Sequence, residues 1–140
     1  MPRIYRSMKA DGDKPLVANS AIGLGVRIGN GPHDDIRVTK SGEVTPGSGG
    51  MSVASNWREL PVHRIPRRLR SQLPSAVGND LLACWRMGSG TFVTERIAVG
   101  LMLRIDKGNH GLVEPTERTL LDNYLQNLAA TRDEWFIDEE

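Results

Sequence analysis

Residues 116–135 read TERTLLDNYLQNLAATRDEW and carry the clearest helical pattern of the chain. Leu121, Tyr124, Leu125 and Leu128 recur at the i, i+3, i+4, i+7 spacing that places side chains on one face of a helix. Pro115 suits the first turn, because its missing N–H has no partner there in any case. We therefore predict one amphipathic helix over residues 116–135, with this face packed into the core.

The residues before this helix predict mostly strands. Residues 81–104 read LLACWRMGSGTFVTERIAVGLMLR, and their alternating and β-branched side chains favour two long strands, 81–87 and 91–104, joined at 88–90. Shorter strands are expected at 4–8, 36–38, 43–45 and 111–114, with the second and third of these forming a hairpin. Residues 16–30 are glycine-spaced and of no assigned type. Prolines at 61, 66 and 74 exclude long regular structure in residues 56–75. The pattern predicts an α+β fold, closed by a C-terminal helix, in a single domain over residues 1–140.

Composition excludes several classes of protein. With 140 residues, 39% apolar and 25% charged, and a net charge of +1, the chain is unlike a disordered protein. The near-neutral balance also excludes a polyanion binder whose whole surface is basic. The 15 glycines and 8 prolines argue against an all-helical bundle.

The cysteine count and the lengths of the apolar stretches predict the compartment of the protein. Cys84 is the one cysteine, which excludes an internal disulfide, and we predict no metal site. No stretch approaches the roughly 18–20 apolar residues that a membrane span needs, and the N-terminus has no apolar signal region. We expect a cytoplasmic chain that does not engage a membrane. Export by machinery that reads no N-terminal signal stays open.

A glycine-rich loop is the first candidate for chemistry. Gly49 and Gly50 precede Met51 and Ser52, and adjacent glycines let a backbone approach a ligand and present free N–H groups to it. A flexible turn is the alternative. Arg6 lies at the end of the first strand. One interpretation is that its guanidinium binds phosphate or pyrophosphate through paired hydrogen bonds, and the alternative is an ordinary surface arginine.

His110 and Glu114 form the second candidate. In a strand, residues 110, 112 and 114 share one face, so the imidazole and the carboxylate point the same way. Such a pair suits acid–base chemistry or the stabilisation of a cation. Alternatively, Glu114 caps the helix that follows.

A run of basic residues is the third candidate. It consists of Arg58, His63, Arg64, Arg67, Arg68 and Arg70, opposed within the run by Glu59 alone. Phosphate groups of a ligand or of a nucleic acid would suit it, with contacts through Arg64, Arg67 and Arg68. The alternative is a solvated loop whose charge the acidic C-terminus balances.

Taken in order, several short motifs resemble a known family. They are Tyr5-Arg6, Val44-Thr45-Pro46, residues 49–53, the His110 segment, Leu121-Asp122-Asn123 and a tryptophan near the end. This order is similar to that of the compact ADP-ribosyltransferase-like toxins delivered by bacterial type VI secretion. The resemblance covers about half the chain, and residues 56–105 match only in being rich in strands.

The resemblance implies two small packed antiparallel sheets with a cleft for NAD between them. It implies that Arg6, Gly49, Gly50 and Ser52 bind NAD, which is consumed as a substrate, without a metal. It also implies that Ser52 supports the nicotinamide site and that His110 is shared with the family. The catalytic carboxylate is our own interpretation of the residues: Glu114 would stabilise an oxocarbenium-like state, with Ser52 and His110 as the other catalytic residues. The resemblance further implies a cognate immunity protein and a macromolecular acceptor of ADP-ribose in the target cell.

Two other functions fit the residues. A metal-independent ribonuclease toxin would use His63, His110, Glu114 and the basic run for phosphodiester chemistry. A binding module with a degenerate, inactive cleft is the non-enzymatic alternative.

Overall fold

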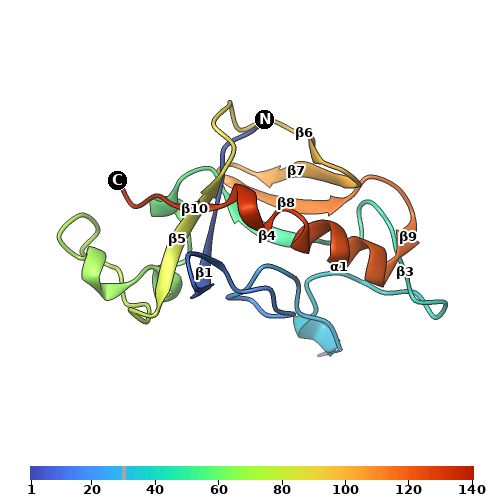
Figure 1. Cartoon of the computed structure of the whole chain (residues 1–140), viewed down its shortest axis with the longest axis horizontal. Helices are drawn as coiled ribbons and strands as arrows, with labels where there is room; N and C mark the ends of the chain where they lie inside the picture. The colour runs from blue at the N-terminus through green and yellow to red at the C-terminus, as the bar shows by residue number, and fades with distance from the viewer. Residues whose placement is uncertain (30) are drawn as a thin grey trace.

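The strands form a curled, largely antiparallel sheet (Figure 1). The computed structural model describes residues 1–29 and 31–140, so residue 30 of the glycine-spaced segment 16–30 lies outside the described residues. The sheet has eight strands in the order β10-β5-β1-β4-β8-β7-β6, with β2 beside β1. Their bounds are β1 Ile4–Asp11, β2 Lys14–Pro15, β4 Met51–Ala54, β5 Leu82–Met87, β6 Glu95–Ala98, β7 Leu101–Lys107, β8 His110–Pro115 and β10 Phe136–Ile137. The predicted α+β class is confirmed.

The predicted strand over 91–104 is wrong in one respect. It is two strands, β6 and β7, which fold back on each other through Gly100. Gly100 has φ +70, a conformation that residues with a Cβ rarely adopt, so the chain reverses there instead of continuing. Alternation of side chains alone cannot reveal such a reversal.

The predicted hairpin between 36–38 and 43–45 is also wrong. A turn does occur at residues 39–43, where the amide of Thr39 donates to the carbonyl of Glu43 over 2.8 Å. However, β3 (Glu43–Val44) pairs with β9 (Thr119–Leu120) in a separate two-stranded sheet, and Ile36 pairs instead with Gly49. A distant segment therefore takes the place of the expected local partner.

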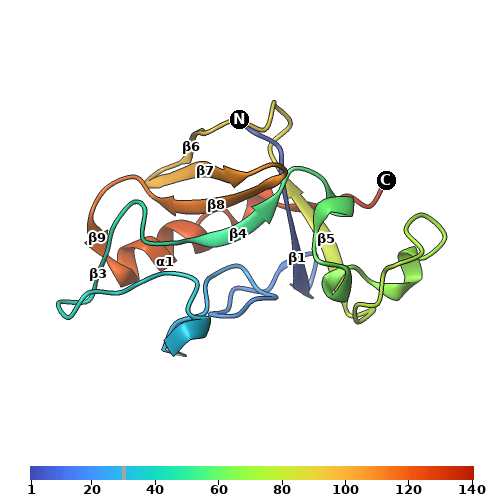
Figure 2. The ribbon, with the colours of Figure 1, turned by 180° about the vertical axis from the view of Figure 1, so that it is seen from behind.

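The main sheet divides between β1 and β4. β1 pairs with β5 over six residue pairs, from Ile4↔Met87 to Lys9↔Leu82, whereas β1 and β4 share the single pair Tyr5↔Ala54. Beyond that pair the two strands separate (Figure 2). The structure therefore has one main sheet in place of the two packed sheets expected, and its two halves, β10-β5-β1 and β4-β8-β7-β6, are joined at a single pair of residues.

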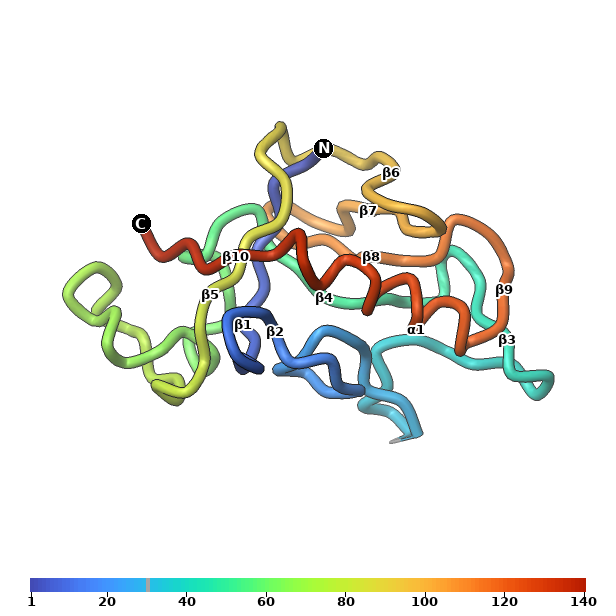
Figure 3. Tube along the Cα trace, viewed as in Figure 1, coloured from blue at the N-terminus to red at the C-terminus, as the bar shows by residue number. Residues whose placement is uncertain are grey.

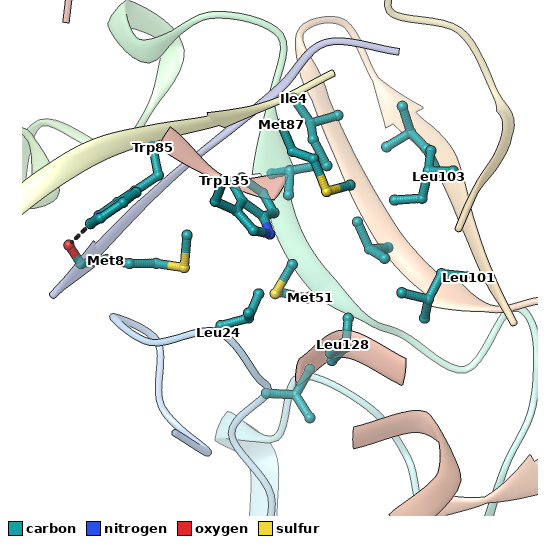
Figure 4. Packing of buried hydrophobic residues seen from close by; sticks show 14 of the residues in the cluster. Ile4, Met8, Leu24, Met51, Trp85, Met87, Leu101, Leu103, Leu128 and Trp135 are labelled. Carbon is teal, nitrogen blue, oxygen red and sulfur yellow. Dashed lines mark hydrogen bonds between the residues drawn. The ribbon is translucent and has the colours of Figure 1, made fainter. Parts of the chain in front are cut away.

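Two apolar clusters cover the two faces of β1. Ile4 and Met8 belong to the larger cluster with Trp85, Trp135 and the helix, and Figure 4 shows the two indoles close together beside Met8. The Trp85 indole N–H donates to the carbonyl of Met8 over 3.0 Å, so its polar atom is satisfied in the core.

The second cluster lies on the opposite face of β1. Tyr5 packs there with Trp57, Ile65 and Cys84. Burial raises the pKa of the Cys84 thiol to about 12, with Glu139 adding to the shift.

The helix is shorter than predicted. α1 spans Leu121–Ala129, because residues 119–120 are drawn into β9 and the chain after Ala130 turns through a 3-10 helix, η5 (Arg132–Glu134). Tyr124 and Leu128 are fully buried, and Leu121 and Leu125 pack partly buried against the same cluster. The predicted apolar face is therefore confirmed, although Trp135 reaches the core from beyond the helix. In Figure 1, α1 lies across β4 and β8.

Residues 56–75 contain three short 3-10 helices in place of longer elements, as their prolines predict. These are η2 (Trp57–Glu59), η3 (Val62–Arg64) and η4 (Arg67–Leu69), and a fourth, η1 (Gly31–His33), lies earlier in the chain. Figure 3 shows the C-terminal tail running along β5 toward this region. Among the helices of the described residues, none has the length and apolar character needed to cross a membrane.

Candidate functional site

A cavity of about 200 Å³ lies where β1 and β4 separate. Most of its polar lining comes from β4 and β8, from the 3-10 region and from one loop: Arg27, Ser52, Glu59, His63, Arg64 and His110. The remaining lining is small or apolar, apart from Arg6 and Ser7 of β1. A larger, open groove of about 600 Å³ runs beside α1, but none of the predicted site residues lines it. We therefore take the smaller cavity, called the split pocket below, as the candidate site.

The structure brings Arg6 and Ser52 together at this pocket, but it gives Arg6 an internal role. The guanidinium is 4% exposed and donates to backbone carbonyls: Nη1 to Ser52 over 2.7 Å, Nε to Gly23 over 3.0 Å, and Nη2 to Ser20 and Gly25. Burial lowers the pKa of Arg6 to about 10, and the nearby Asp35 carboxylate opposes that shift. Arg6 thus ties the 20–25 loop to β4 and shapes the wall of the pocket.

Gly49 and Gly50, which were expected to present their amides to a ligand, do not line the split pocket. The Gly50 N–H donates to the carbonyl of Asp35 over 2.9 Å, so it is not free for a ligand. A Cβ on Gly50 would overlap the carbonyl oxygen of Val113, and one on Gly49 would overlap that of Asp35. Close packing of backbone segments explains both glycines.

Glu114 is not among the residues that line the pocket either. Its side chain is 4% exposed, and Oε2 accepts from Arg104 Nε over 3.0 Å and from the amide of Gly47 over 3.1 Å. Glu114 shares a face of β8 with His110, as the strand period predicts, but a rise of about 3.3 Å per residue separates the two Cα atoms by about 13 Å. The two side chains therefore do not form one acid–base pair.

His110 and Ser52 do share the pocket. In the β4–β8 ladder, Ser52 lies opposite Leu112 and His110 lies opposite Ala54. The side chains of Ser52 and His110 therefore both point to the face of the sheet turned away from α1. His110 Nδ1 lies 2.7 Å from Oδ1 of Asp106. Among hydrogen bonds between described residues, neither the Ser52 hydroxyl nor His110 Nε2 takes part in one, so both atoms can meet a ligand.

The lining that comes from η3 and from the loop at residue 27 is cationic. Arg64 donates from Nη1 to the carbonyl of Ala21 over 3.1 Å and from Nε to Nε2 of His63 over 3.2 Å. Burial lowers the pKa of Arg64 and the nearby charge of Arg27 lowers it further. Arg27 is paired with Asp35 at 2.9 Å. Among the described residues, Glu59 is the one carboxylate that lines the pocket. The balance favours an anionic ligand.

Much of the predicted basic run is neutralised internally. Arg68 forms two hydrogen bonds to Glu139, at 2.6 and 2.8 Å, and Arg58 stacks over Trp57 at 4.3 Å and donates to the carbonyl of Glu140. The acidic C-terminus therefore balances part of the run, as one alternative expected. Arg64 alone of the arginines in this run lines the split pocket.

Three pocket-associated residues, Arg27, Glu59 and Asp106, were not proposed for any role from the sequence. Asp106 could have been found, because Lys107, Gly108 and Asn109 separate it from His110 as a tight turn between two strands would. For Arg27 and Glu59 no local pattern exists, since they reach the pocket only through tertiary contacts. In residues 1–29 and 31–140, no cluster of three or more His, Cys, Asp or Glu side chains could hold a metal ion. The chain matches no protein-family model, and no similar curated protein or solved structure was found.

Proposed function

We propose that the split pocket binds NAD and that the protein is a toxin of the mono-ADP-ribosyltransferase or NAD glycohydrolase type. The observation that carries the proposal is the division of the sheet at Tyr5↔Ala54, with a cationic pocket at the division. The resemblance to ADP-ribosyltransferase-like toxins implies a cleft between two packed sheets, and the proposal takes the division of this sheet as the counterpart of that cleft.

The lining suggests how NAD would sit. Arg64 and Arg27 offer charge-assisted hydrogen bonds to the pyrophosphate, and Ser52 and His110 line the pocket from β4 and β8. The cavity of about 200 Å³ is smaller than the roughly 300–1,000 Å³ of most ligand pockets, so it takes one part of the dinucleotide and leaves the rest outside.

The reaction needs a carboxylate near the reacting ribose. The C–N bond to nicotinamide breaks and its electron pair leaves with nicotinamide, so the ribose becomes oxocarbenium-like. Water or an acceptor side chain then adds and releases a proton. Because Glu114 is bound to Arg104 outside the pocket lining, the cation-stabilising role expected for it falls to Glu59 in this proposal. His110 would take the released proton.

NAD hydrolysis by purified variants tests this assignment. Glu59→Gln keeps the shape of the side chain and removes its charge, so we expect turnover to fall on the order of 10²–10³-fold. Glu117→Gln, an exposed carboxylate outside the pocket, is the matched control and should leave turnover unchanged. If Glu114→Gln abolishes turnover in a folded protein while Glu59→Gln does not, the original role of Glu114 is restored.

A second candidate, the metal-independent ribonuclease, is favoured by one specific observation. His63 and His110 come from different elements and both line the pocket beside Arg64, an arrangement suited to phosphodiester chemistry. Measuring RNA degradation in EDTA beside NAD hydrolysis separates the two functions. Absence of both activities would favour the non-catalytic binding module.

The proposed toxin acts in the cytoplasm of target cells, which it reaches by a secretion route that reads no cleaved signal. Its producer would need a cognate immunity protein. The cationic pocket suits an acidic segment of such a partner, because opposite charges steer association. The acceptor of ADP-ribose would be a macromolecule of the target cell, or water in a glycohydrolase.

A further inference from the structure

Asp106 and His110 face each other across the turn between β7 and β8. Nδ1 of His110 lies 2.7 Å from Oδ1 of Asp106, and the same oxygen accepts from the amide of Lys107 over 3.0 Å. The β7–β8 ladder shifts register between Ile105 and Lys107, which brings Lys107 opposite His110. The carboxylate is thus held from two sides, by a backbone amide and by the imidazole.

The pKa of Asp106 agrees with this geometry. Partial burial raises the pKa, but the hydrogen bond and charge attraction from His110, with the amides of Asp106 and Lys107, outweigh it and lower the pKa below its usual value. Asp106 is therefore ionised near neutral pH, and an ionised carboxylate can only accept a hydrogen bond. The proton in the Asp106–His110 contact must belong to His110 Nδ1.

The two histidines of the pocket differ in which nitrogen remains available. Nε2 of His63 accepts from Arg64 Nε over 3.2 Å, so that atom is occupied. Nε2 of His110 takes part in no hydrogen bond between described residues, and His110 lines the pocket. A neutral imidazole protonated at Nδ1 has its basic lone pair on Nε2.

We propose that Asp106 is a positioning residue that holds His110 in the tautomer protonated at Nδ1, so that Nε2 serves as the proton acceptor of the split pocket. The use of Nε2 in catalysis rests on the proposed function. The tautomer does not, because it follows from the contact between these two side chains alone.

Ring-nitrogen NMR of the full-length protein tests the tautomer directly. At about pH 8, where an ordinary imidazole is neutral, we expect the ¹⁵N shifts of His110 to show a protonated Nδ1 and a bare Nε2. Asp106→Ala removes the acceptor, and His110 should then become protonated mainly at Nε2. Asp106→Asn keeps an oxygen acceptor in the same place, so it should restore much of the Nδ1-protonated form.

Ser55→Ala is the matched control for damage to the turn. The Ser55 hydroxyl donates over 2.8 Å to Oδ1 of Asn109, which belongs to the same turn as Asp106 and His110, and Ser55 does not line the split pocket. This variant should leave the tautomer unchanged. A wild-type His110 protonated at Nε2, or an Asp106→Ala variant with an unchanged tautomer, would overturn the proposal.

Turnover supplies the second readout. With whichever substrate the wild type consumes, Asp106→Ala should lower kcat by about 10²-fold, the low end of what a positioned acid–base group contributes, and Asp106→Asn should recover part of it. A tautomer that shifts without any change in kcat would overturn the positioning role. A wild type inert toward both NAD and RNA would end the proposed function and leave the tautomer result standing.

Discussion

At the scale of single residues, Arg6 shows that a buried arginine can serve the fold instead of a ligand. Four of its five N–H donors meet carbonyls of Ser20, Gly23, Gly25 and Ser52, which belong to two separate segments. The hydrogen bonds to Gly23 and Gly25 are buried and those to Ser20 and Ser52 are partly buried, so Arg6 supplies donors to carbonyls that have little access to water. The planar guanidinium of Arg6 suits these contacts, because its N–H donors point in several fixed directions.

Arg6→Ala should therefore destabilise the protein and not simply weaken ligand binding. Buried carbonyls lose their donor and a cavity remains, so we expect a loss of about 2–4 kcal/mol in the free energy of unfolding. Urea unfolding followed by circular dichroism measures it. Arg3→Ala, the same change at an exposed position of the N-terminal segment, should stay within about 0.5 kcal/mol of the wild type. Equal stabilities for the two variants would contradict the role given to Arg6.

At the scale of elements, α1 is fixed to the sheet by one hydroxyl as well as by its apolar face. Tyr124 OH donates to the carbonyl of Val113 in β8 over 2.6 Å and accepts from the amide of Met51 in β4 over 3.2 Å. The helix thus bridges the two strands whose other face carries Ser52 and His110. Through this contact the position of α1 is coupled to the geometry of the pocket wall.

Tyr124→Phe should destabilise the protein by about 1–3 kcal/mol, because it leaves buried polar groups of Val113 and Met51 without that partner. Tyr5→Phe provides a matched control. The Tyr5 hydroxyl donates to Asp138 in a partly exposed site where water can replace it, so this change should cost less. Thermal and urea unfolding of both variants would compare them, and a larger loss from Tyr5→Phe would disprove the stated role of the Tyr124 hydroxyl.

At the scale of the whole molecule, the net charge of +1 conceals an uneven distribution. The tail charges Asp138 and Glu139 neutralise Arg86 and Arg68 at the edge of β5, with ion-pair distances of 3.0 and 2.6 Å. The split pocket is lined by Arg6, Arg27 and Arg64 against the carboxylate of Glu59, and Arg27 is also paired with Asp35. The arginines therefore outnumber the nearby carboxylates at the division of the sheet, which favours an anionic ligand there.

Inorganic pyrophosphate should stabilise the folded protein through this pocket. A ligand at 100 times its Kd that binds only the native state adds about 2.7 kcal/mol to the free energy of unfolding. We expect Tm to rise with pyrophosphate, the rise to shrink at high salt, and Arg64→Ala to abolish it. Arg67→Ala changes an exposed arginine outside the pocket lining and should retain the effect. Equal losses in both variants would indicate diffuse charge attraction instead of a site.

The sequence by itself determined the local features of this protein. Side-chain periodicity correctly identified the buried face of α1 through Tyr124 and Leu128, because this pattern depends only on backbone geometry. The α+β class and the irregular, proline-containing 56–75 segment follow from the same local rules.

The tertiary structure alone decided where those features meet. β3 pairs with β9, 75 residues further along the chain at Val44↔Thr119, so the expected hairpin does not form. Glu114 is bound by Arg104 and by the amide of Gly47 and lies outside the split pocket lining. Arg27, Glu59 and His110 reach the split pocket from three separate segments. No pattern along the chain encodes this convergence of side chains, because it depends on where β1 and β4 separate. The packing of the two half-sheets sets the position of that separation.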